Sequence, residues 1–416
     1  MKKTTIPEQL NLCLMARKFP ALGRSSDQGL LWTIAKNMVS KGHSVTILAA
    51  RSPLGEHVIQ RDNVTAYYLL EGKNNTHVKK FPELAKKQFF ELHQQRPFHL
   101  VHSIDDSAKR IAKIKKDYKV AVCYDVAATQ MSQLFSILGM AQETLPSLIR
   151  TGLSVTYKFL RTYYGKDRPL LKSADGIFVT SPMQRIALER YYLYPDSRTF
   201  TVPYGLEIGD LQPKEQSEDL RKLLHIPQQS QTVVTVTDMS EWEELKNLLV
   251  AFQKVAIKLS NARLVIVGTG PLKKQIEFET YSLALGGRVI FAGNIPSAEI
   301  PEYISLGSVF VNLSSRTSGY EPVMLEAMAQ EKVIIGSEVS PISTVVEDGK
   351  DGFLIRPADV GSLASLMLDI FTENLETAEI GQRARKKVLN LFDTDKMVRQ
   401  TLEAYNQILN RTGYYL

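Results

Sequence analysis

Cysteine is nearly absent from this chain, since its 416 residues include only Cys13 and Cys123. Each lies inside or at the end of an apolar run, so we expect buried thiols in a reducing cytoplasm, and neither a disulfide framework nor a cysteine zinc site. Long apolar stretches are also missing, because no run approaches the roughly 20 residues that span a bilayer. The N-terminus becomes charged at Arg17 and Lys18, too early for a secretory signal. These absences predict a cytoplasmic protein without a membrane span.

The composition is that of an ordinary globular protein. Hydrophobic residues make up 44% and charged residues 23% of the chain, which excludes disordered and fibrous classes. A chain of this length exceeds what one compact core usually supports, so two domains are expected. The net charge of +7 is compatible with nucleic acid, anionic lipid or anionic substrates. No nucleic-acid-binding motif accompanies the charge, so nucleic acid is not expected as a partner.

Apolar strand patterns alternate with helical spacing along the chain. In the first half, strands are predicted at residues 11–15, 44–48, 100–102, 120–122, 176–179 and 200–202. After a polar connector the alternation restarts, with strands predicted at residues 232–236, 263–267, 288–291, 309–312 and 332–336. Near-continuous apolar strands separated by helices indicate parallel sheets covered on both faces. We predict two doubly wound α/β domains, residues 1–207 and 208–395. A C-terminal helix is predicted at residues 396–416. The sequence allows it to pack on either domain, and we expect it to pack on the N-terminal one.

The carboxyl ends of parallel strands are where open α/β sheets bind their ligands. Two such domains in tandem therefore predict an interdomain cleft with a ligand site on each side. That arrangement suits a reaction with two substrates.

Three ordered motifs of the second half resemble family 4 glycosyltransferases. They are LVIVGTGPL at residues 264–272, VIFAGNIP at 289–296, and EPVMLEAMA at 321–329, the last continued by VVEDGKDGFLI at 345–355. A lone Gly-x-Gly would be a weak signal, whereas an ordered set is specific. Looser matches at residues 42–47, 174–181 and 202–207 extend the resemblance through most of the chain. The resemblance implies the GT-B fold, with two Rossmann-like domains, and retaining sugar transfer.

The resemblance also implies a nucleotide-sugar donor, such as a UDP- or GDP-sugar, and no metal. Glu326 corresponds to the later glutamate of the family's E-x7-E pair, which binds the ribose. The earlier glutamate of the pair corresponds to Ser318, and Glu321 can take its place if the loop is rearranged. The resemblance therefore implies a catalytic role for Ser318, Glu321 and His102. Donor contacts are implied at Gly268, Gly270, Asn294, Ile295, Gly319, Tyr320, Val323, Met324 and Glu326.

The predicted phosphate site departs from the family pattern. An ungapped alignment with the family pattern, counted back from residues 251–252, places Asp238 where the family has Arg and Glu243 where it has Lys. Like charges about 4 Å apart repel by about 4 kcal/mol at an effective dielectric constant of 20, so this cradle would repel a diphosphate. If the loop follows a different path, Lys246 takes the place of the family's lysine. The alternative is that Lys246 lies on a solvated helix face. Pro322 also lacks an N–H where the family offers amides to phosphate.

On the acceptor side, the family's small-residue loop corresponds to Ser25, Ser26 and nearby Gly29. His102 matches a family histidine, although a core histidine is the commoner meaning of a lone His. The His-Asp step that often follows the next strand is Tyr124-Asp125 here, which argues against acceptor activation by a histidine at that position.

Basic and aromatic residues crowd residues 150–172. In relatives such a segment often faces a lipid-linked acceptor, which predicts peripheral contact with the anionic inner face of a membrane; the alternative is a solvated helix with inward-packed aromatics.

The leading hypothesis is a hexosyltransferase that moves a sugar from a nucleotide sugar to a glycan or lipid-linked acceptor in cell-surface polysaccharide or glycoconjugate synthesis. The substitutions in the phosphate site motivate a second hypothesis, a non-catalytic GT-B subunit that binds a glycan or a protein partner. A sugar-nucleotide epimerase of the same fold is a third alternative.

Overall fold

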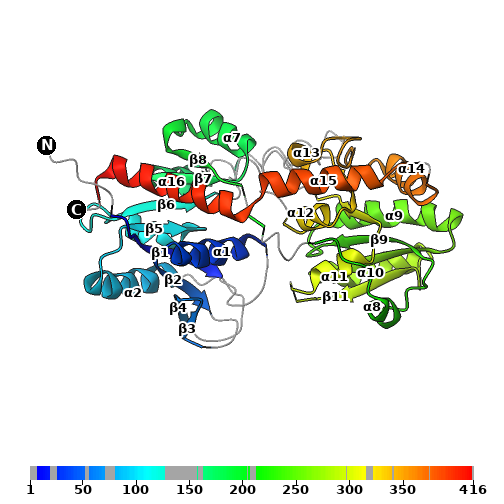
Figure 1. Cartoon of the computed structure of the whole chain (residues 1–416), viewed down its shortest axis with the longest axis horizontal. Coiled ribbons are helices and arrows are strands. Elements are labelled where there is room, and N and C mark those ends of the chain that lie inside the picture. The colour runs from blue at the N-terminus through cyan, green and yellow to red at the C-terminus, as the bar shows by residue number, and fades with distance from the viewer. Residues whose placement is uncertain are drawn as a thin grey trace. The chain divides into compact units, whose positions relative to one another are not determined.

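The computed structural model describes residues 7–18, 26–51, 56–70, 80–126, 157, 163–203, 205–206, 212–296, 298–314, 322–339, 342–373 and 375–414. The chain divides into two compact units. The first unit combines Met1–Gly205 with Thr394–Leu416, and the second is Leu206–Asp393. The C-terminal segment therefore lies in the first unit, and each unit is built around its own sheet (Figure 1).

The first unit contains an eight-stranded sheet in the order β3-β4-β2-β1-β5-β6-β7-β8. All neighbouring strands are parallel except β3 and β4. The strands are β1 (Asn11–Lys18), β2 (Ser44–Arg51), β3 (Val58–Arg61), β4 (Val64–Leu70), β5 (Leu100–Ser103), β6 (Ala121–Asp125), β7 (Gly176–Val179) and β8 (Thr199–Thr201). Each strand expected in this half is present.

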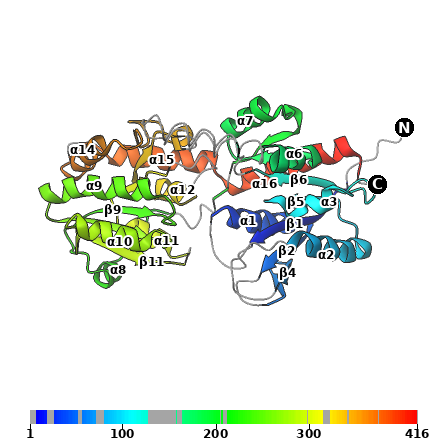
Figure 2. The same ribbon diagram turned by 180° about the vertical axis from the view of Figure 1, so that it is seen from behind.

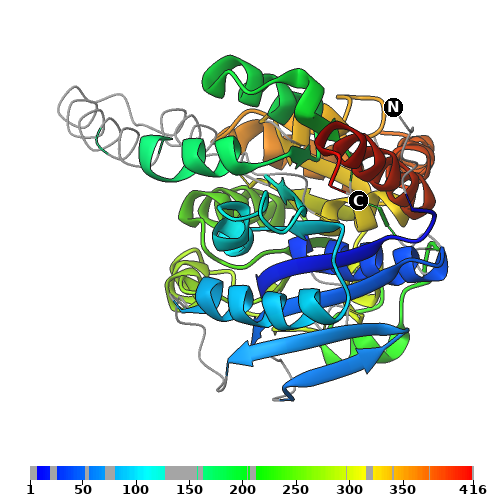
Figure 3. The same ribbon diagram turned by 90° about the vertical axis from the view of Figure 1, so that its left-hand side faces the viewer.

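The hairpin β3–β4 was not predicted, and it forms the antiparallel edge of this sheet (Figure 3). Asp62 and Asn63 make its two-residue turn, and both have positive φ angles, 51° and 59°. Turns of this kind favour Asn and Asp because these residues tolerate the left-handed conformation. The Asp-Asn pair between two short β-rich runs was the available signal.

Helices cover both faces of the first sheet. Ile34 and Met38 of α1 pack on one face beside Tyr405 and Ile408 of α16, the C-terminal helix. The other face is covered by α2, α3, α6 and α7. The helical segments are α1 (Ser26–Ser40), α2 (Phe81–Gln95), η1 (Asp106–Ala108), α3 (Lys109–Ala112), η2 (Tyr163–Asp167), α6 (Arg168–Ser173), α7 (Pro182–Tyr192), η3 (Asp196–Arg198) and α16 (Thr394–Thr412). Burial of the strands on both faces explains their near-continuous apolar character.

The second unit contains a six-stranded parallel sheet in the order β11-β10-β9-β12-β13-β14. Its strands are β9 (Gln231–Val236), β10 (Ala262–Val267), β11 (Val289–Gly293), β12 (Val309–Asn312), β13 (Val333–Ser337) and β14 (Phe353–Ile355). The first five were predicted from their apolar runs. The edge strand β14 has only three residues, too few for a pattern to show.

Helices again flank the sheet, as Figure 2 shows from behind. A core of side chains from α9, α10 and α14 packs on one face, and α11 and α12 contact strands β9, β12 and β13. The helices are α8 (Glu218–Leu223), α9 (Trp242–Lys258), α10 (Lys273–Ser282), α11 (Ile300–Ser305), α12 (Pro322–Ala329), α13 (Ile342–Val345), α14 (Val360–Phe371) and α15 (Ala378–Leu391). Across the described ranges, no helix is long and apolar enough to cross a bilayer.

Candidate active site

The strand order of the second unit reverses direction between β9 and β12. From β9 the chain proceeds outward to β10 and β11, then returns to place β12 on the other side of β9. Ligands of open α/β sheets bind outside the carboxyl ends of the strands at such a point. The loops after these strands meet here, because Ser314 Oγ donates a hydrogen bond of 3.0 Å to Glu241 Oε1.

A glycine turn after β10 packs against the loop that follows β9. Gly268 has a φ of +121°, and its N–H donates to the Gly293 carbonyl at 2.8 Å. A Cβ on Gly268 would collide with the carbonyl oxygen of Thr237, and one on Gly270 with that of Asp238. The glycines therefore let two segments of the chain itself approach closely. Direct contact of either glycine with a donor stays a prediction.

Carboxylates gather in the loop that joins β9 to α9. Asp238 is exposed, and its Oδ1 accepts a hydrogen bond of 3.1 Å from the Ser240 N–H. Glu243 is exposed in the first turn of α9, where a negative charge is favourable to the helix. Glu244 beside it is buried, 3.4 Å from the Thr237 hydroxyl. Lys246 is half-buried one turn later. Asp238 and Glu244 accept hydrogen bonds within this loop, and the donor contacts assigned to Asp238, Glu243 and Lys246 stay predictions.

Glu326 is buried on α12, the helix that follows β12, and is only 6% exposed. Val323 is half-buried on the same helix, whereas Met324 has no exposed surface. Asn294 is exposed and Ile295 half-buried just after β11, the edge strand. The predicted residues Ser318, Gly319, Tyr320 and Glu321 lie outside the described residues. The donor contacts assigned to this set stay predictions.

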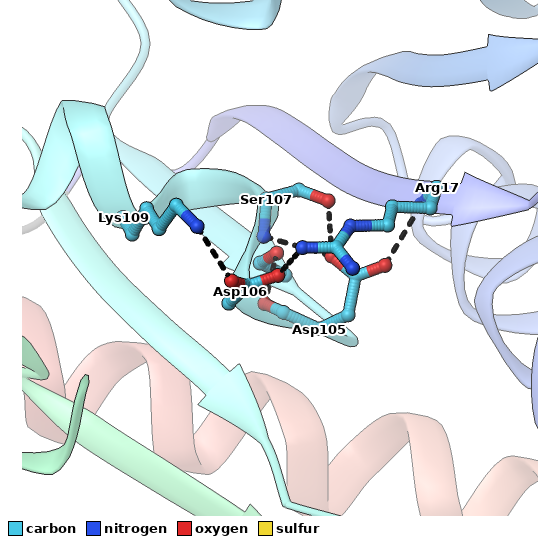
Figure 4. A network of polar contacts seen from close by, with 6 residues as sticks. Arg17, Asp105, Asp106, Ser107 and Lys109 are labelled. Carbon is cyan, nitrogen blue, oxygen red and sulfur yellow. Dashed lines mark hydrogen bonds and ion pairs between the residues drawn. The ribbon is translucent and has the colours of Figure 1, made fainter. Parts of the chain in front are cut away.

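The first unit has its own reversal of strand order, between β1 and β5. Charged side chains bridge it (Figure 4): the Arg17 N–H donates to Asp105 Oδ2 at 2.9 Å, and the Arg17 guanidinium pairs with Asp106. Asp106 also accepts from Lys109 Nζ at 2.7 Å. The other Asp105 oxygen accepts from the Ser107 N–H at 2.8 Å. The network fastens the carboxyl ends of the two central strands together.

This network was not predicted, although its signal was present in the sequence. Arg17 lies at the end of one apolar run, and Asp105 and Asp106 directly follow another. Desolvation, and then the neighbouring cations Arg17 and Arg110, lower the pKa of Lys109. The Arg17 and Lys109 side chains are 34% and 44% exposed, so both are accessible to a ligand. Chemically, the pair could hold an anionic or hydroxyl-rich group.

The predicted acceptor loop is only partly described. Ser25 lies outside the described residues, and Ser26 and Gly29 are in the first turns of α1, which follows β1 in the chain. Their assignment to the acceptor side stays a prediction.

His102 is completely buried in the core of the first unit. Its Nδ1 lies 2.7 Å from the Tyr405 hydroxyl on α16, and its Nε2 lies 3.1 Å from Asp125 Oδ2. The ring stacks on Phe178 with a centroid distance of 4.6 Å. Tyr124 is also fully buried, and burial raises the pKa of its hydroxyl. The structure thus gives His102 a packing partner on each side; its predicted role in catalysis remains untested.

Metal ligation finds no support in the parts of the chain that the structure describes, where no three His, Cys, Asp or Glu side chains are grouped to hold an ion. The buried Cys13 and Cys123 are both free thiols.

Comparison with known proteins finds a match to a family model within the second unit. Residues 216–387 match the family model described as glycosyl transferases group 1. Most of the second unit is thus similar to the group 1 glycosyltransferases. The curated relative N-acetyl-alpha-D-glucosaminyl L-malate synthase of Bacillus anthracis is 24% identical over 264 residues, which cover 61% of this chain and 68% of that protein. Alpha-monoglucosyldiacylglycerol synthase of Streptococcus pneumoniae is 26% identical over 192 residues, which cover 45% of this chain and 43% of that protein.

The fold of the whole chain also has known counterparts. The Anabaena protein Alr3699/HepE, solved with UDP-glucose, superposes with a TM-score of 0.71 at 17% identity, covering 95% of this chain and 99% of that one. The predicted GT-B fold and the resemblance to family 4 glycosyltransferases are confirmed. A glycosyltransferase is favoured over the non-catalytic subunit, since the similar curated proteins are named as synthases and transferases.

Proposed function

We propose that this chain is a retaining glycosyltransferase that moves a sugar from a nucleotide sugar to a glycan or a lipid-linked acceptor. The observation that carries the proposal is the similarity to group 1 glycosyltransferases, in a unit whose sheet reverses its strand order between β9 and β12. A structural neighbour is solved with UDP-glucose, which supports a nucleotide-sugar donor. The names of the two relatives point to L-malate and diacylglycerol-linked acceptors in those proteins, so both a hydrophilic and a lipid-linked acceptor are kept in the proposal.

The donor is proposed to lie outside the carboxyl ends of β9 and β12. Glu326 would accept hydrogen bonds from the ribose, and residues 318–321 would carry the group that faces the donor sugar. Between Thr237 and Leu245 the sequence holds three glutamates, one aspartate and no lysine or arginine. The diphosphate would therefore depend on Lys246 and on the amides of Val323 and Met324 at the start of α12, because backbone N–H groups at a helix N-terminus attract phosphate.

Chemistry at such a site is electrostatic. As the bond between the anomeric carbon and the β-phosphate breaks, negative charge accumulates on the leaving diphosphate, and donors that neutralise that charge accelerate the step. A phosphate oxygen would take the proton of the attacking hydroxyl on the same face of the sugar, which retains the anomeric configuration. No protein base is needed in this scheme, which is compatible with the burial of His102.

A transfer assay tests this proposal. The full-length protein is incubated with UDP-glucose, UDP-N-acetylglucosamine or GDP-mannose and with L-malate, diacylglycerol in micelles, or oligosaccharides, and product is followed by mass spectrometry. The proposal predicts an α-linked product from an α-linked donor, identified by the proton coupling constant of the anomeric centre. A β-linked product would contradict retention. Release of a converted nucleotide sugar without acceptor would identify an epimerase instead.

Contact with an anionic membrane at its cytoplasmic face belongs to the same proposal wherever the acceptor is lipid-linked. The sequence supports it through the basic and aromatic residues 150–172, of which Tyr157, Tyr164 and Arg168 are among those described.

A further inference from the structure

Large apolar side chains are exposed on α9 and α10, two helices that pack on one face of the second sheet. Ile257, near the end of α9, is 79% exposed, and Phe278 and Tyr281 of α10 are 68% and 81% exposed. An exposed apolar residue on its own is ordinary, whereas a contiguous apolar patch on a soluble protein marks a contact surface. What matters is therefore whether the three side chains lie together.

The C-terminal ends of the two helices are fastened to each other. The side-chain amide of Gln253 on α9 donates a hydrogen bond of 2.8 Å to the Leu283 carbonyl, just after α10. The Arg288 guanidinium, which follows α10 in the chain, binds the Ala256 carbonyl of α9. Ile257 is four residues beyond Gln253, so both lie on the side of α9 that faces α10.

The two rings lie on the outer side of α10. Ile276 and Thr280 are the buried residues of this helix. Phe278 is two residues from each of them, which is about 200° around a helix, so its ring faces away from the core. Tyr281 is three residues further, on the same side. Ile257, Phe278 and Tyr281 thus form one surface at the adjacent helix ends, which we call the α9–α10 patch.

Charges of opposite sign border the two halves of the patch. Lys254 and Lys258 are exposed on α9, one turn apart. On α10, the exposed Glu277 and the half-buried Glu279 stand directly before and after the first ring. Among the residues that the structure describes, Glu277 is the one of these four with an ion partner, Lys273 at 3.6 Å, and that exposed pair is weak. The patch therefore has a basic half on α9 and an acidic half on α10.

We propose that the α9–α10 patch binds the same patch of a second copy of the chain about a two-fold axis. A two-fold interface pairs a surface with itself, so the axis places α10 of each copy over α9 of the other. The lysines of one copy then meet the glutamates of the other on both sides of the axis, and the apolar side chains are buried between them. The patch is self-complementary in charge, which is the property that selects a second copy as its occupant.

An anionic bilayer fits this patch less well. The carboxylates of Glu277 and Glu279 border the ring of Phe278 and would be held against lipid phosphates. The cations of α10, Lys273 and Lys274, lie in its first turn, away from the end where the helices meet.

The size of the patch sets the expected affinity. A fully buried aromatic side chain removes about 150–250 Å² from solvent, so the four rings of a dimer remove about 400–800 Å² at the observed exposures. Ile257 and the ion pairs add to this area. The total reaches at most the lower end of the roughly 1,200–2,000 Å² of a stable interface, so we expect a reversible dimer with a Kd of about 10–100 µM.

Sedimentation of the full chain tests the dimer over about 1–300 µM, a range that brackets this Kd. The double variant Ile257→Ser/Phe278→Ser should dimerise at least about tenfold more weakly, because each copy loses two apolar side chains from the contact. Two controls should dimerise as the wild type does. Tyr281→Phe keeps its ring, and Leu391→Ser changes an apolar residue that is 44% exposed on α15.

An exchange of charges identifies the occupant as a second copy. The acidic variant, Lys254→Glu/Lys258→Glu, should stay monomeric because carboxylates then face carboxylates across the axis. The basic variant, Glu277→Lys/Glu279→Lys, should stay monomeric for the corresponding reason. An equimolar mixture of the two should form a dimer again, since one chain presents only carboxylates and the other only ammonium groups at these positions. Restoration by mixing also shows that both variants are folded.

Three results would overturn the inference: a wild-type monomer at every concentration, a dimer that Ile257→Ser/Phe278→Ser leaves unchanged, or a mixture of the charge variants that stays monomeric. A monomer that floats with anionic vesicles, and no longer floats as the double variant, would assign the patch to a lipid surface instead.

The dimer is independent of the proposed sugar transfer. The C-terminal ends of α9 and α10 lead into β10 and β11, so the patch lies at the amino ends of the strands, opposite the edge proposed for the donor. Nucleotide binding per chain should therefore be the same for the double variant and the wild type. Loss of the dimer leaves the donor site untested, and loss of nucleotide binding leaves the dimer standing, so the two failures are distinguishable.

Discussion

Replacing Tyr405 with phenylalanine probes how the C-terminal helix is held to the first sheet. The Tyr405 hydroxyl lies 2.7 Å from His102 Nδ1, and both side chains are completely buried. Tyr405→Phe keeps the ring contacts with His102 and Phe178, whose centroids lie 5.7 Å and 5.8 Å away, and removes only the hydroxyl. A buried nitrogen left without its partner costs about 1–3 kcal/mol.

That cost is large enough to measure by thermal unfolding. For units of about 150–250 residues, each kcal/mol shifts the melting temperature by roughly 2–4 °C, so a decrease of about 2–12 °C is expected for the first unit. Circular dichroism and calorimetry of the variant would record it. Tyr281→Phe is the control, because Tyr281 is 81% exposed on α10 and should leave the melting temperature unchanged. If Tyr405→Phe melts with the control, the hydrogen bond to His102 does not hold α16 in place.

Three further changes test the second unit. Gly270→Ala should destabilise the second unit by at least about 2 kcal/mol in urea unfolding, because the added Cβ collides with the Asp238 carbonyl. Gly286→Ala is the control, since a Cβ there meets nothing within 4 Å. Equal urea midpoints for the two variants would contradict the close approach at Gly270. Burial lowers the pKa of Lys332 to about 8, so between pH 8 and the ordinary value of 10.5 the unfolded chain binds more protons and stability rises with pH. The free energy of unfolding of Lys332→Met, from urea titrations, should lack that rise with pH, which is no more than about 3 kcal/mol in the wild type. Parallel pH profiles for the variant and the wild type would contradict the lowered pKa of Lys332. Asp238→Asn/Glu243→Gln should tighten binding of the preferred nucleoside diphosphate by a factor of about 5, since exposed charges act weakly through solvent, and weaker binding would show that these acids contact the ligand favourably.

The sequence predicted those strands whose side chains are buried on both faces. Continuous apolar runs such as residues 264–267 and 309–311 are typical of a central parallel strand. Two of the three strands that were missed lie at sheet edges: β14 is three residues long, and only Ile59 of the four residues of β3 is buried. The third, β4, pairs with β3 in the hairpin. Edge strands carry less apolar pattern because one side and often one face meet solvent.

Site residues were predictable where the signal is local. The turn around Gly268 could be found from its two glycines, but its neighbour, the loop carrying Thr237 and Asp238, is brought there only by the pairing of β9 with β10. The contact between His102 and Tyr405 spans 303 positions in the sequence, so no window of sequence indicates it. Arg17, Asp105 and Asp106 follow strands directly, and only the strand order shows that they meet.

Nucleotide binding by the second unit is the most direct test of a donor site at Glu326. The purified full-length protein would be titrated with UDP, GDP and ADP by calorimetry, alongside Glu326→Gln and the control Glu302→Gln, an exposed glutamate on α11. We expect micromolar affinity for one nucleotide, lost in Glu326→Gln and kept in Glu302→Gln. Absence of binding to every nucleotide by the folded wild-type protein, or equal affinity in the two variants, would contradict a donor site at Glu326.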